Sequence, residues 1–404
     1  MAEAAAALAA RCCIAGGGPA GMMLGLLLAR AGVDVLVLEK HADFLRDFRG
    51  DTVHPSTLQL MHELGLLDAF LARPHDEARV LRAHVGGAEL TLADFSRLHA
   101  RCRFIALMPQ WEFLDFLRAE AQRYPAFRLR MRCEATGLIE RDGRVLGVQA
   151  IDGDGPLEVR ADLVIGADGR HSRVRAAAGL AVQNLGAPID VLWLRLPLAA
   201  GDPPDSGGYI GRGHFLVMIR RREYWQCAYV IPKGGSDAVR AAGLPAFRAE
   251  LARTAPMLAG RIETLASWDQ VKLLSVTVDR LRHWWKQGLL CIGDAAHAMS
   301  PIGGVGINLA IQDAVAAANL LARPLADSRT GGAALTPLLA RLQRRRMLPT
   351  RLTQAAQLLI QDRVLAPALR DSGPLAVPSA LHWLQRWPVL RALPASLVGV
   401  GGRP

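Results

Sequence analysis

A glycine-rich turn between two apolar segments near the start of the chain restricts its fold more than any other feature. The segment "CCIAGGGPAGMMLGLLLARAGVDVLVLEK" predicts a strand over Cys12–Ala15, a helix over Pro19–Arg30 and a second strand over Val33–Leu38. A strand–helix–strand unit of this length places its two strands in parallel, with the helix packed on the sheet. The sequence therefore predicts an α/β fold built on a parallel sheet.

The glycines of this turn stand in the GxGxxG order. The first permits the tight turn, the second lets the backbone approach a pyrophosphate, and the third lets the helix pack on the strand. The helix N-terminus would face the phosphates with its free amides. Glu39 follows at about the 20-residue spacing of a ribose-binding carboxylate, although a plain surface carboxylate is the alternative. The predicted dinucleotide-binding residues are Gly16, Gly18, Pro19, Ala20, Gly21, Glu39 and Lys40.

Two later strand-like segments also end in a glycine and an acid. "ADLVIGADGRHSRVR" predicts a buried strand around Leu163–Ile165 with Asp168 in its exit turn, and Leu289–Ile292 is followed by Gly293 and Asp294. By itself, Asp168 is equally well explained as a turn residue. Ligands of open α/β sheets bind at the carboxyl ends of the strands, so the repetition favours a shared site.

This triple pattern resembles the single-component flavoprotein aromatic hydroxylases, the family of para-hydroxybenzoate hydroxylase and the ubiquinone-pathway hydroxylases. The resemblance loosely covers residues 10–330. It implies that the first turn and Glu39 hold the ADP half of FAD and that Asp294 binds the ribityl chain. It also implies that Arg49 and Gln110 contact the sugar or phosphate part, and that Asp168 serves both FAD and the nicotinamide coenzyme.

The segment after Asp294 suits a flat ring system. Pro301 precedes a turn with Gly303, Gly304 and Gly306, and a side chain there would collide with the flavin ring. Ile307 begins an apolar pattern with helical spacing, so the helix N-terminus points back at the ligand. The backbone amides of 306–308, ending at Asn308, would stabilise the negative charge of a reduced flavin. An ordinary helix-surface or capping role for Asn308 remains open.

The chemistry implied by the resemblance is reduction of FAD by NADPH or NADH, followed by O2 addition. The resulting flavin C4a-hydroperoxide would hydroxylate an aromatic or polycyclic small molecule. Only one dinucleotide unit is present, which fits transient coenzyme binding. No catalytic residue is assigned, because none of the four tyrosines matches a phenol-relay position. A drug-inactivating monooxygenase, an epoxidase, a lipid reductase and a non-catalytic FAD-binding scaffold are the alternatives.

Strand-like segments with turn residues between them fill residues 183–270, and a hairpin around Gly86 and Gly87 is expected to join the same sheet. The domain prediction is a discontinuous FAD-binding domain (8–78, 101–182 and 271–335), a mainly β substrate domain (79–100 and 183–270) and a C-terminal helical region (336–404). The candidate substrate residues are Trp193, Arg195, Phe215, Tyr224 and Gln226. For any single residue of this set, packing in the core or the sheet is the favoured explanation.

Composition limits the remaining partners. The net charge is +11, but the arginines are spread along the chain, which argues against nucleic-acid binding and leaves attraction of anionic ligands as the alternative. Six cysteines without a CxxC pair indicate no metal site and a reduced, cytoplasmic protein. We expect the alanines before Cys12 to form a frayed leader. The apolar C-terminal tail would cover a domain, form a subunit contact in a homodimer rather than a monomer, or lie on a membrane surface.

Overall fold

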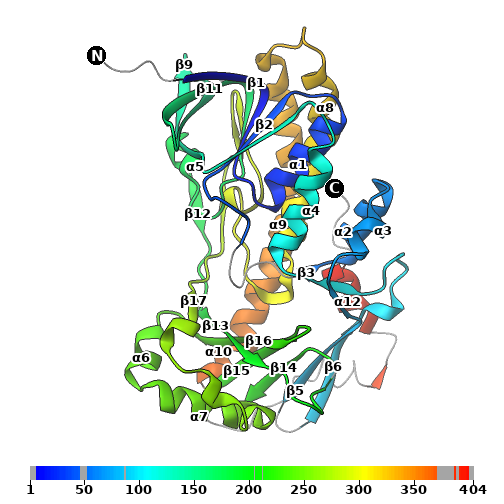
Figure 1. The fold of residues 1–404 in the computed structure, drawn as a ribbon, viewed down its shortest axis with the longest axis vertical. Coiled ribbons are helices and arrows are strands. Elements are labelled where there is room, and N and C mark those ends of the chain that lie inside the picture. Colours follow the sequence, from blue (N-terminus) through cyan, green and yellow to red (C-terminus); the bar gives the residue numbers. More distant parts are fainter. Residues whose placement is uncertain are drawn as a thin grey trace.

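The chain folds into an elongated molecule with one large sheet at each end and a long helix between them (Figure 1). The computed structural model describes residues 6–45, 52–85, 88–203, 205–211, 213–370, 386–387 and 391–399. The upper sheet contains both strands of the glycine-turn unit, and the lower sheet contains the strands of residues 80–94 and 189–274. The α/β fold class with a parallel sheet, a second mainly β part and C-terminal helices is confirmed.

The upper sheet has a parallel centre in which the neighbours are β20, β11, β1, β2 and β8. Ala15 at the end of β1 lies opposite Leu38 of β2 and Gly166 of β11, and Gly166 lies opposite Cys291 of β20. The carboxyl ends of four adjacent strands therefore meet at one edge. The strands are β1 (Ala6–Ala15), β2 (Val35–Glu39), β8 (Phe127–Met131), β9 (Glu134–Arg141), β10 (Arg144–Asp152), β11 (Gly155–Gly166), β19 (Trp285–Lys286) and β20 (Leu289–Cys291).

The expectation of a frayed leader before Cys12 is wrong for the described residues. Strand β1 begins at Ala6, and Ala6–Ala10 pair in register with Leu157–Ala161 of β11. The neighbouring strand supplies the hydrogen bonds that an isolated alanine segment lacks, and alanine's weak β-propensity gave no signal of this pairing. The domain division made from the sequence stays a prediction.

Helices pack on the parallel sheet through an extensive apolar core. Helix α1 (Pro19–Arg30) has the predicted bounds, and α4 (Gln110–Ala121) and α8 (Gly306–Ala326) lie beside it. Together with the turn before it, α8 is long and apolar enough to cross a membrane. Because 67% of its most apolar window is buried in the protein, we interpret α8 as the core helix of this layer.

The lower sheet has seven strands and combines two distant parts of the sequence. The predicted hairpin joins it, because β5 pairs in parallel with β14. Helix α7 (Leu244–Thr254) packs on one face and α10 (Ala366–Arg370) on the other. The strands in order are β17 (Lys272–Leu274), β13 (Ile189–Pro197), β16 (Tyr224–Pro232), β15 (His214–Arg220), β14 (Gly207–Gly211), β5 (Val80–Val85) and β6 (Ala88–Asp94).

Short elements complete the described chain, and some of them form two small sheets. One small sheet contains β3 (Thr52–Val53), β7 (Ile105–Leu107) and β4 (Asp76–Ala78), and the other contains β12 (Val182–Asn184) and β18 (Asp279–Leu281). The short helices are α2 (Pro55–Glu63), α3 (Leu67–Leu71), α5 (Arg173–Ala177), α6 (Ser236–Ala241) and α12 (Ala392–Gly399).

The segment Thr336–Gln361 predicts a long helix interrupted at Pro349, but helix α9 (Thr336–Ile360) is continuous, so the predicted interruption is wrong. A proline inside a helix removes one hydrogen bond and costs about 3 kcal/mol. Arg346 and Thr350, on either side of Pro349, are fully buried, and this packing holds the helix together across the proline. The helix runs on through a π-helical turn, η8 (Gln361–Leu365), into α10.

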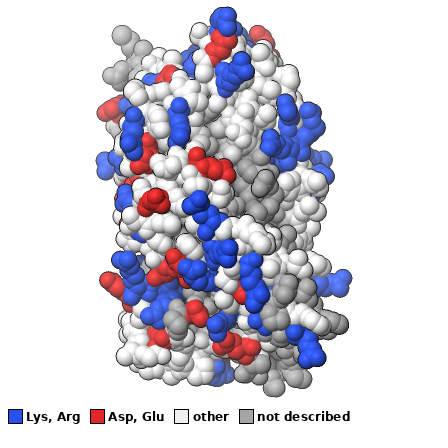
Figure 2. All heavy atoms as spheres, turned by 90° about the vertical axis from the view of Figure 1, so that its right-hand side faces the viewer, with Lys and Arg blue, Asp and Glu red and all other residues white. Residues whose placement is uncertain are grey.

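The charged side chains are spread over the viewed surface, and the cysteines are unpaired, as the composition predicts. Figure 2 shows basic and acidic side chains interspersed over the viewed face, with uncharged surface between them. All six cysteines are free and buried. Burial raises the pKa of Cys133 to about 11 and that of Cys227 to about 12.

Candidate functional site

The glycine turn after β1 leaves room for a phosphate group at the N-terminus of α1. Gly16 has a φ of +109°, and a Cβ on Gly21 would overlap the carbonyl oxygen of Gly16. A Cβ on Gly18 would meet no atom within 4 Å, so open space lies over this residue. The helix start has no side-chain cap and no acidic residue in its first turn. Free amides facing open space fit the pyrophosphate of FAD.

Glu39 holds this turn in place. One carboxylate oxygen accepts a hydrogen bond from the Gly17 amide at 2.9 Å, and the other accepts one from the His41 amide at 3.0 Å. Glu39 is buried, whereas Lys40 is exposed. The carboxylate therefore lies between the turn and the end of β2, where the sequence places the ribose. Ribose binding by Glu39 stays a prediction.

Asp168, in the exit turn of β11, binds the start of the short helix α5, whose N-cap residue is Ser172. Its carboxylate accepts hydrogen bonds from the Ser172 hydroxyl at 2.5 Å and the Val174 amide at 3.1 Å. Burial raises the pKa of Asp168 above its usual value, although these hydrogen bonds oppose the shift. The same hydrogen bonds fix the exit turn beside the Gly16 turn, since the Asp168 backbone is among the atoms nearest a Cβ on Gly16. The cofactor role implied by the resemblance stays a prediction.

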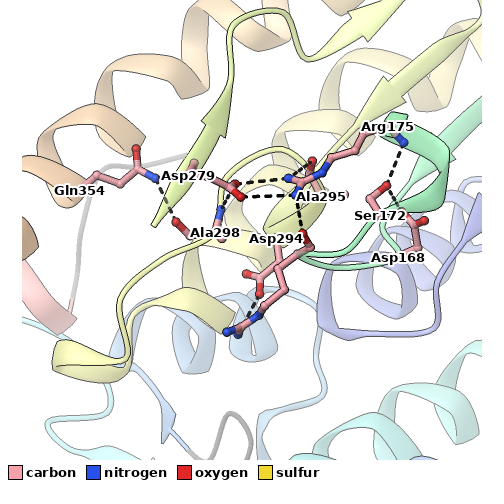
Figure 3. A network of polar contacts seen from close by, with 9 residues as sticks. Asp168, Ser172, Arg175, Asp279, Asp294, Ala295, Ala298 and Gln354 are labelled. Atoms are coloured by element: carbon pink, nitrogen blue, oxygen red, sulfur yellow. Dashed lines mark hydrogen bonds and ion pairs between the residues drawn. The ribbon is translucent and has the colours of Figure 1, made fainter. Parts of the chain in front are cut away.

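Asp294 lies at the end of β20 in a network that Figure 3 shows from close by. Arg170 forms an ion pair with its carboxylate at 3.4 Å. Behind it, buried Arg175 pairs with Asp279 at 3.3 Å, and Asp279 also accepts from the Ala298 amide at 3.3 Å. The turn that carries Asp294 is thus tied to α5 on one side and to β18 on the other.

A second, fully buried cluster holds the turn that carries Asp294 through the backbone of Gly293. Asp313 of α8 accepts from the Gly293 amide at 3.1 Å, from His297 Nε2 at 2.6 Å and from Arg346 Nε at 2.7 Å. Burial alone would raise the pKa of Asp313, but His297 and Arg346 bring it below its usual value. His297 is thus a packed side chain, stacked at an angle on Trp284 with 5.0 Å between ring centroids.

The glycine turn before α8 is fastened to the segment after β3. The Thr52 hydroxyl donates to the Gly304 carbonyl oxygen at 2.8 Å. The Asn308 side-chain oxygen accepts from the His54 amide at 2.9 Å and the Thr57 hydroxyl at 2.8 Å, while its nitrogen donates to the Thr52 carbonyl at 3.2 Å. The Asn308 side chain is therefore occupied by the protein, and its backbone amide is the group left for a cofactor.

Alanine at Gly304 should weaken FAD binding. Gly304 has a φ of +61°, and a Cβ there would overlap the Thr52 hydroxyl, so the turn must move. Strain of this kind costs about 1–3 kcal/mol, which corresponds to a rise of about 5- to 150-fold in the Kd for FAD. Fluorescence titration of the apoprotein measures this Kd. Gly331→Ala is the matched control, because no atom lies within 4 Å of its Cβ position. Equal Kd values for the two variants would contradict the prediction.

His54 gives the fold a pH dependence. Burial lowers its pKa from 6.5 to about 4, although a hydrogen bond between Nδ1 and the Val398 carbonyl at 2.8 Å opposes this. The unfolded chain binds the proton more tightly, so stability is full above about pH 6.5 and falls by up to about 3 kcal/mol as the pH approaches 4.

Urea denaturation between pH 7 and pH 4.5 checks this expectation. The His54→Asn variant should lose the part of the pH dependence that the histidine supplies. His62→Asn, on the exposed side of the helix that His54 precedes, should keep the wild-type slope. A wild-type slope in His54→Asn would contradict the assignment.

The remaining predicted cofactor residues are placed as follows. Gln110 is the first residue of α4 and is buried. Pro301 precedes the glycine turn, Gly303 has a φ of +75°, and Gly306 and Ile307 begin α8. Arg49 lies outside the described residues. The structure brings the four strand ends and the glycine turn into one region, while direct FAD contacts for each residue stay predictions.

All five candidate substrate residues lie on one face of the lower sheet. Arg195 pairs with Gln226 and Trp193 with Ala228 across β13 and β16, and alternation along the strands puts them on the face that includes Phe215. Tyr224 lies under the Arg195 guanidinium, 5.0 Å from ring centroid to Cζ. Trp193 and Phe215 pack in the same cluster as Ile302 of the glycine turn. This face therefore adjoins the glycine turn at 303–306, where the flavin ring is predicted to lie.

Several residues that hold the site were not identified from the sequence. Arg170 forms an ion pair with Asp294. Thr52 and His54 hold the glycine turn, and Arg346 completes the buried cluster around Asp313. The sequence signal for Arg346 was the set of polar residues at helical spacing in α9, a pattern that is also typical of a solvent-facing stripe. The sequence also suggests His214 as a polar group of the substrate pocket, beside Arg195 and Gln226, but His214 binds Glu250 of α7 at 2.8 Å on the opposite face of the sheet.

Comparison with known proteins agrees with this geometry. Residues 9–356 match the family described as FAD binding domain. The chain is 33% identical over 386 residues to 6-methylpretetramide 4-monooxygenase of Streptomyces rimosus, covering 94% of the chain and 90% of that relative. It is 30% identical over 314 residues to rifampicin monooxygenase of Streptomyces venezuelae, covering 74% of the chain but only 61% of that relative. The crystal structure of PqsL from Pseudomonas aeruginosa superposes with a TM-score of 0.76 at 23% identity, covering 90% of the chain and 98% of PqsL.

Proposed function

We propose, given that this chain belongs to the FAD binding domain family and is an FAD-dependent monooxygenase, that it uses NADPH or NADH and O2 to hydroxylate a polycyclic aromatic small molecule. The relative with 94% coverage is named for oxygenation of 6-methylpretetramide, and this similarity supports a multi-ring aromatic substrate. A drug-inactivating activity, the second candidate, is favoured by the similarity to rifampicin monooxygenase over 74% of the chain.

One observation carries the proposal. The glycine turn at 303–306 connects two surfaces, because α8 begins directly after it and Ile302 before it packs against the same apolar cluster as Trp193 and Phe215 of the lower sheet. A flat cofactor held by the strand ends would therefore have an apolar, partly aromatic sheet face beside its ring. Such a face suits a flat apolar substrate and excludes water from the reaction.

The residues of the chain would divide the work as follows. FAD, when bound, supplies electron transfer from the coenzyme and delivery of one oxygen atom from O2. The strand-end turns and Asp294 would hold the cofactor, and the amides at the start of α8 would stabilise negative charge on the reduced ring. The sheet face would orient the substrate next to that ring. No side chain is assigned as an acid or base.

An oxygen-transfer assay tests the proposal. FAD-loaded protein is mixed with NADPH or NADH in air, with a panel of polycyclic phenols beside monocyclic phenols, and coenzyme oxidation, H2O2 and product mass are recorded. The expected result is a product that gains one oxygen atom from a polycyclic compound. If coenzyme oxidation produced an equal amount of H2O2 with every compound, the proposed substrate class would be wrong. A yellow protein that consumes neither coenzyme would indicate a binding scaffold instead.

The cellular setting is part of the same proposal. We propose a cytoplasmic location, and the six buried free cysteines support it. Cell fractionation tests the location, and light scattering of the purified protein decides between a monomer and a homodimer.

A further inference from the structure

From Arg346 onward, helix α9 buries polar residues and exposes several leucines. Its buried polar residues recur at helical spacing, whereas Leu348, Leu352 and Leu359 are 62%, 62% and 59% exposed. A helix on a protein surface normally buries its apolar face. The buried polar residues of α9 must therefore have hydrogen-bond partners in the protein interior. The buried polar residues are Arg346, Thr350, Gln354, Gln357 and Gln361, the last in the π-helical turn that continues the helix.

The glutamines bind one short segment of backbone. Gln354 donates to the Ala298 carbonyl at 3.1 Å, and Gln357 donates to the Ser300 carbonyl at 2.9 Å and the Ile302 carbonyl at 2.8 Å. Gln357 also accepts from the Ser300 amide at 3.2 Å. The segment 298–302, which joins the Asp294 turn to the glycine turn, is thus held by side chains that follow it by more than 50 residues in the sequence.

The last glutamine lies where the helix changes its winding. Gln361 donates to the Ser300 hydroxyl at 2.7 Å from the first residue of η8, and Ser300 Oγ accepts in turn from the Ile302 amide at 3.3 Å. Single π-turns inside α-helices are frequently found at functional sites. Here the turn lets the helix continue into α10, where Leu369 packs on the lower sheet and Ala368 accepts a backbone hydrogen bond from Gly213 at 3.0 Å.

One continuous helix therefore contacts both halves of the candidate site. Its middle holds the segment before the glycine turn, and its end lies on the sheet face with the candidate substrate residues. Gln354 forms two hydrogen bonds to backbone, Gln357 forms three, and Gln361 forms one to the Ser300 hydroxyl. Breaking such a bond leaves an unsatisfied buried polar group at a cost of about 1–3 kcal/mol, so these amides fix the loop more tightly than apolar contacts do.

We propose that Gln357 and Gln361 are positioning residues for the flavin site. Through Ser300 they set the segment 298–302, and with it the glycine turn and the start of α8, relative to the substrate face. This inference rests on the proposed function only for the identity of that face. Loosening the segment moves the α8 amides away from the place where negative charge develops on the reduced ring, so reduced FAD should lose stabilisation.

The two-electron midpoint potential of bound FAD tests this proposal. In Gln357→Met, Gln361→Met and Ser300→Ala, the ratio of reduced to oxidised flavin at a fixed potential should fall about tenfold, which is about 30 mV for a two-electron couple. Ser300→Thr, which keeps a hydroxyl, should retain the wild-type potential.

Gln343→Met is the matched control on the same helix. The Gln343 side chain also holds backbone, but it accepts from the Trp284 amide at 3.0 Å and donates to the Arg282 carbonyl at 2.9 Å. The change therefore removes the same kind of hydrogen bonds from α9 without touching the segment 298–302. The potential of bound FAD should be unchanged in this variant.

The outcomes separate the proposal from a purely structural role and from the proposed function. Dye-coupled reduction of the FAD-loaded protein needs neither NADPH nor substrate, so failure to find a substrate leaves this result intact. Potentials of Gln361→Met and Ser300→Ala equal to wild type would overturn the proposal, as would an equal shift in Gln343→Met. If a glutamine variant does not fold, the smaller Ser300→Ala change alone decides. An additive shift in the Gln361→Met/Ser300→Ala double variant would also overturn it, because both changes remove one shared hydrogen bond.

Discussion

Asp294→Ala should yield a colourless protein that no longer retains FAD through gel filtration. Asp294 ends β20 in the row of strand ends, and its carboxylate meets only Arg170, at 3.4 Å, among the described residues. A charged hydrogen bond to a ligand hydroxyl contributes about 1.5–3 kcal/mol, so its loss raises the Kd about 10- to 100-fold. The absorbance ratio of flavin to protein after gel filtration measures the effect, with circular dichroism to show that the fold is intact.

Two further variants sharpen this result. Asp294→Asn keeps the shape and one acceptor oxygen, so its FAD occupancy should lie between that of the wild type and the alanine variant. Asp154→Ala removes an aspartate whose side chain is 94% exposed in a turn of the same sheet and should retain full occupancy. Full flavin occupancy in Asp294→Ala would mean that this carboxylate does not bind the cofactor.

Asp313→Ala should cause a large loss of stability. It leaves Arg346 and His297 buried without their anion, and breaking a buried ion pair costs about 3–5 kcal/mol. The Asp313→Ala/Arg346→Met double variant should recover part of this loss, because it removes the uncompensated cation as well. Urea denaturation of the apoproteins gives the free energies of unfolding.

The pH dependence gives a second measurement of the same cluster. The pKa of Asp313 is lowered in the folded protein, so its contribution is complete above about pH 4, the usual aspartate pKa, and disappears as the pH falls through the lowered value. Asp362→Ala, on the exposed side of the helical run that contains Arg346, should leave stability within about 0.5 kcal/mol of wild type. A similar loss in both variants would contradict the role given to Asp313.

Local patterns predicted the parts of the fold that depend on neighbouring residues. Gly16, Gly18 and Gly21 gave the first turn and the bounds of α1, and the glycines at 303–306 gave the start of α8, because turns and helix starts are set by residues close in sequence. The strand-end rule correctly brought Asp168 and Asp294 to one edge of the sheet. The hairpin was also placed in the right sheet.

Contacts over long sequence distances explain what the sequence did not reveal. Asp313 and Arg346 are polar residues of two helices, and only their packing shows that they form a buried pair. The sequence predicted a cofactor role for the backbone amide of Asn308 and left the role of its side chain open, whereas the structure shows that Thr52, His54 and Thr57 bind this side chain. Pro349 signals a helix break on its own, and tertiary packing overrides that signal.

The burial of every cysteine has a consequence for the durability of the protein. A monooxygenase works with O2 and a reduced cofactor, and it meets H2O2 whenever oxygen transfer fails. Peroxide attacks thiolates, whereas burial keeps all six thiols out of solvent and raises the pKa of Cys133 and Cys227 to about 11 and 12. Inactivation by its own by-product should therefore proceed through groups other than cysteine, and thiol-specific reagents should leave the folded protein unlabelled.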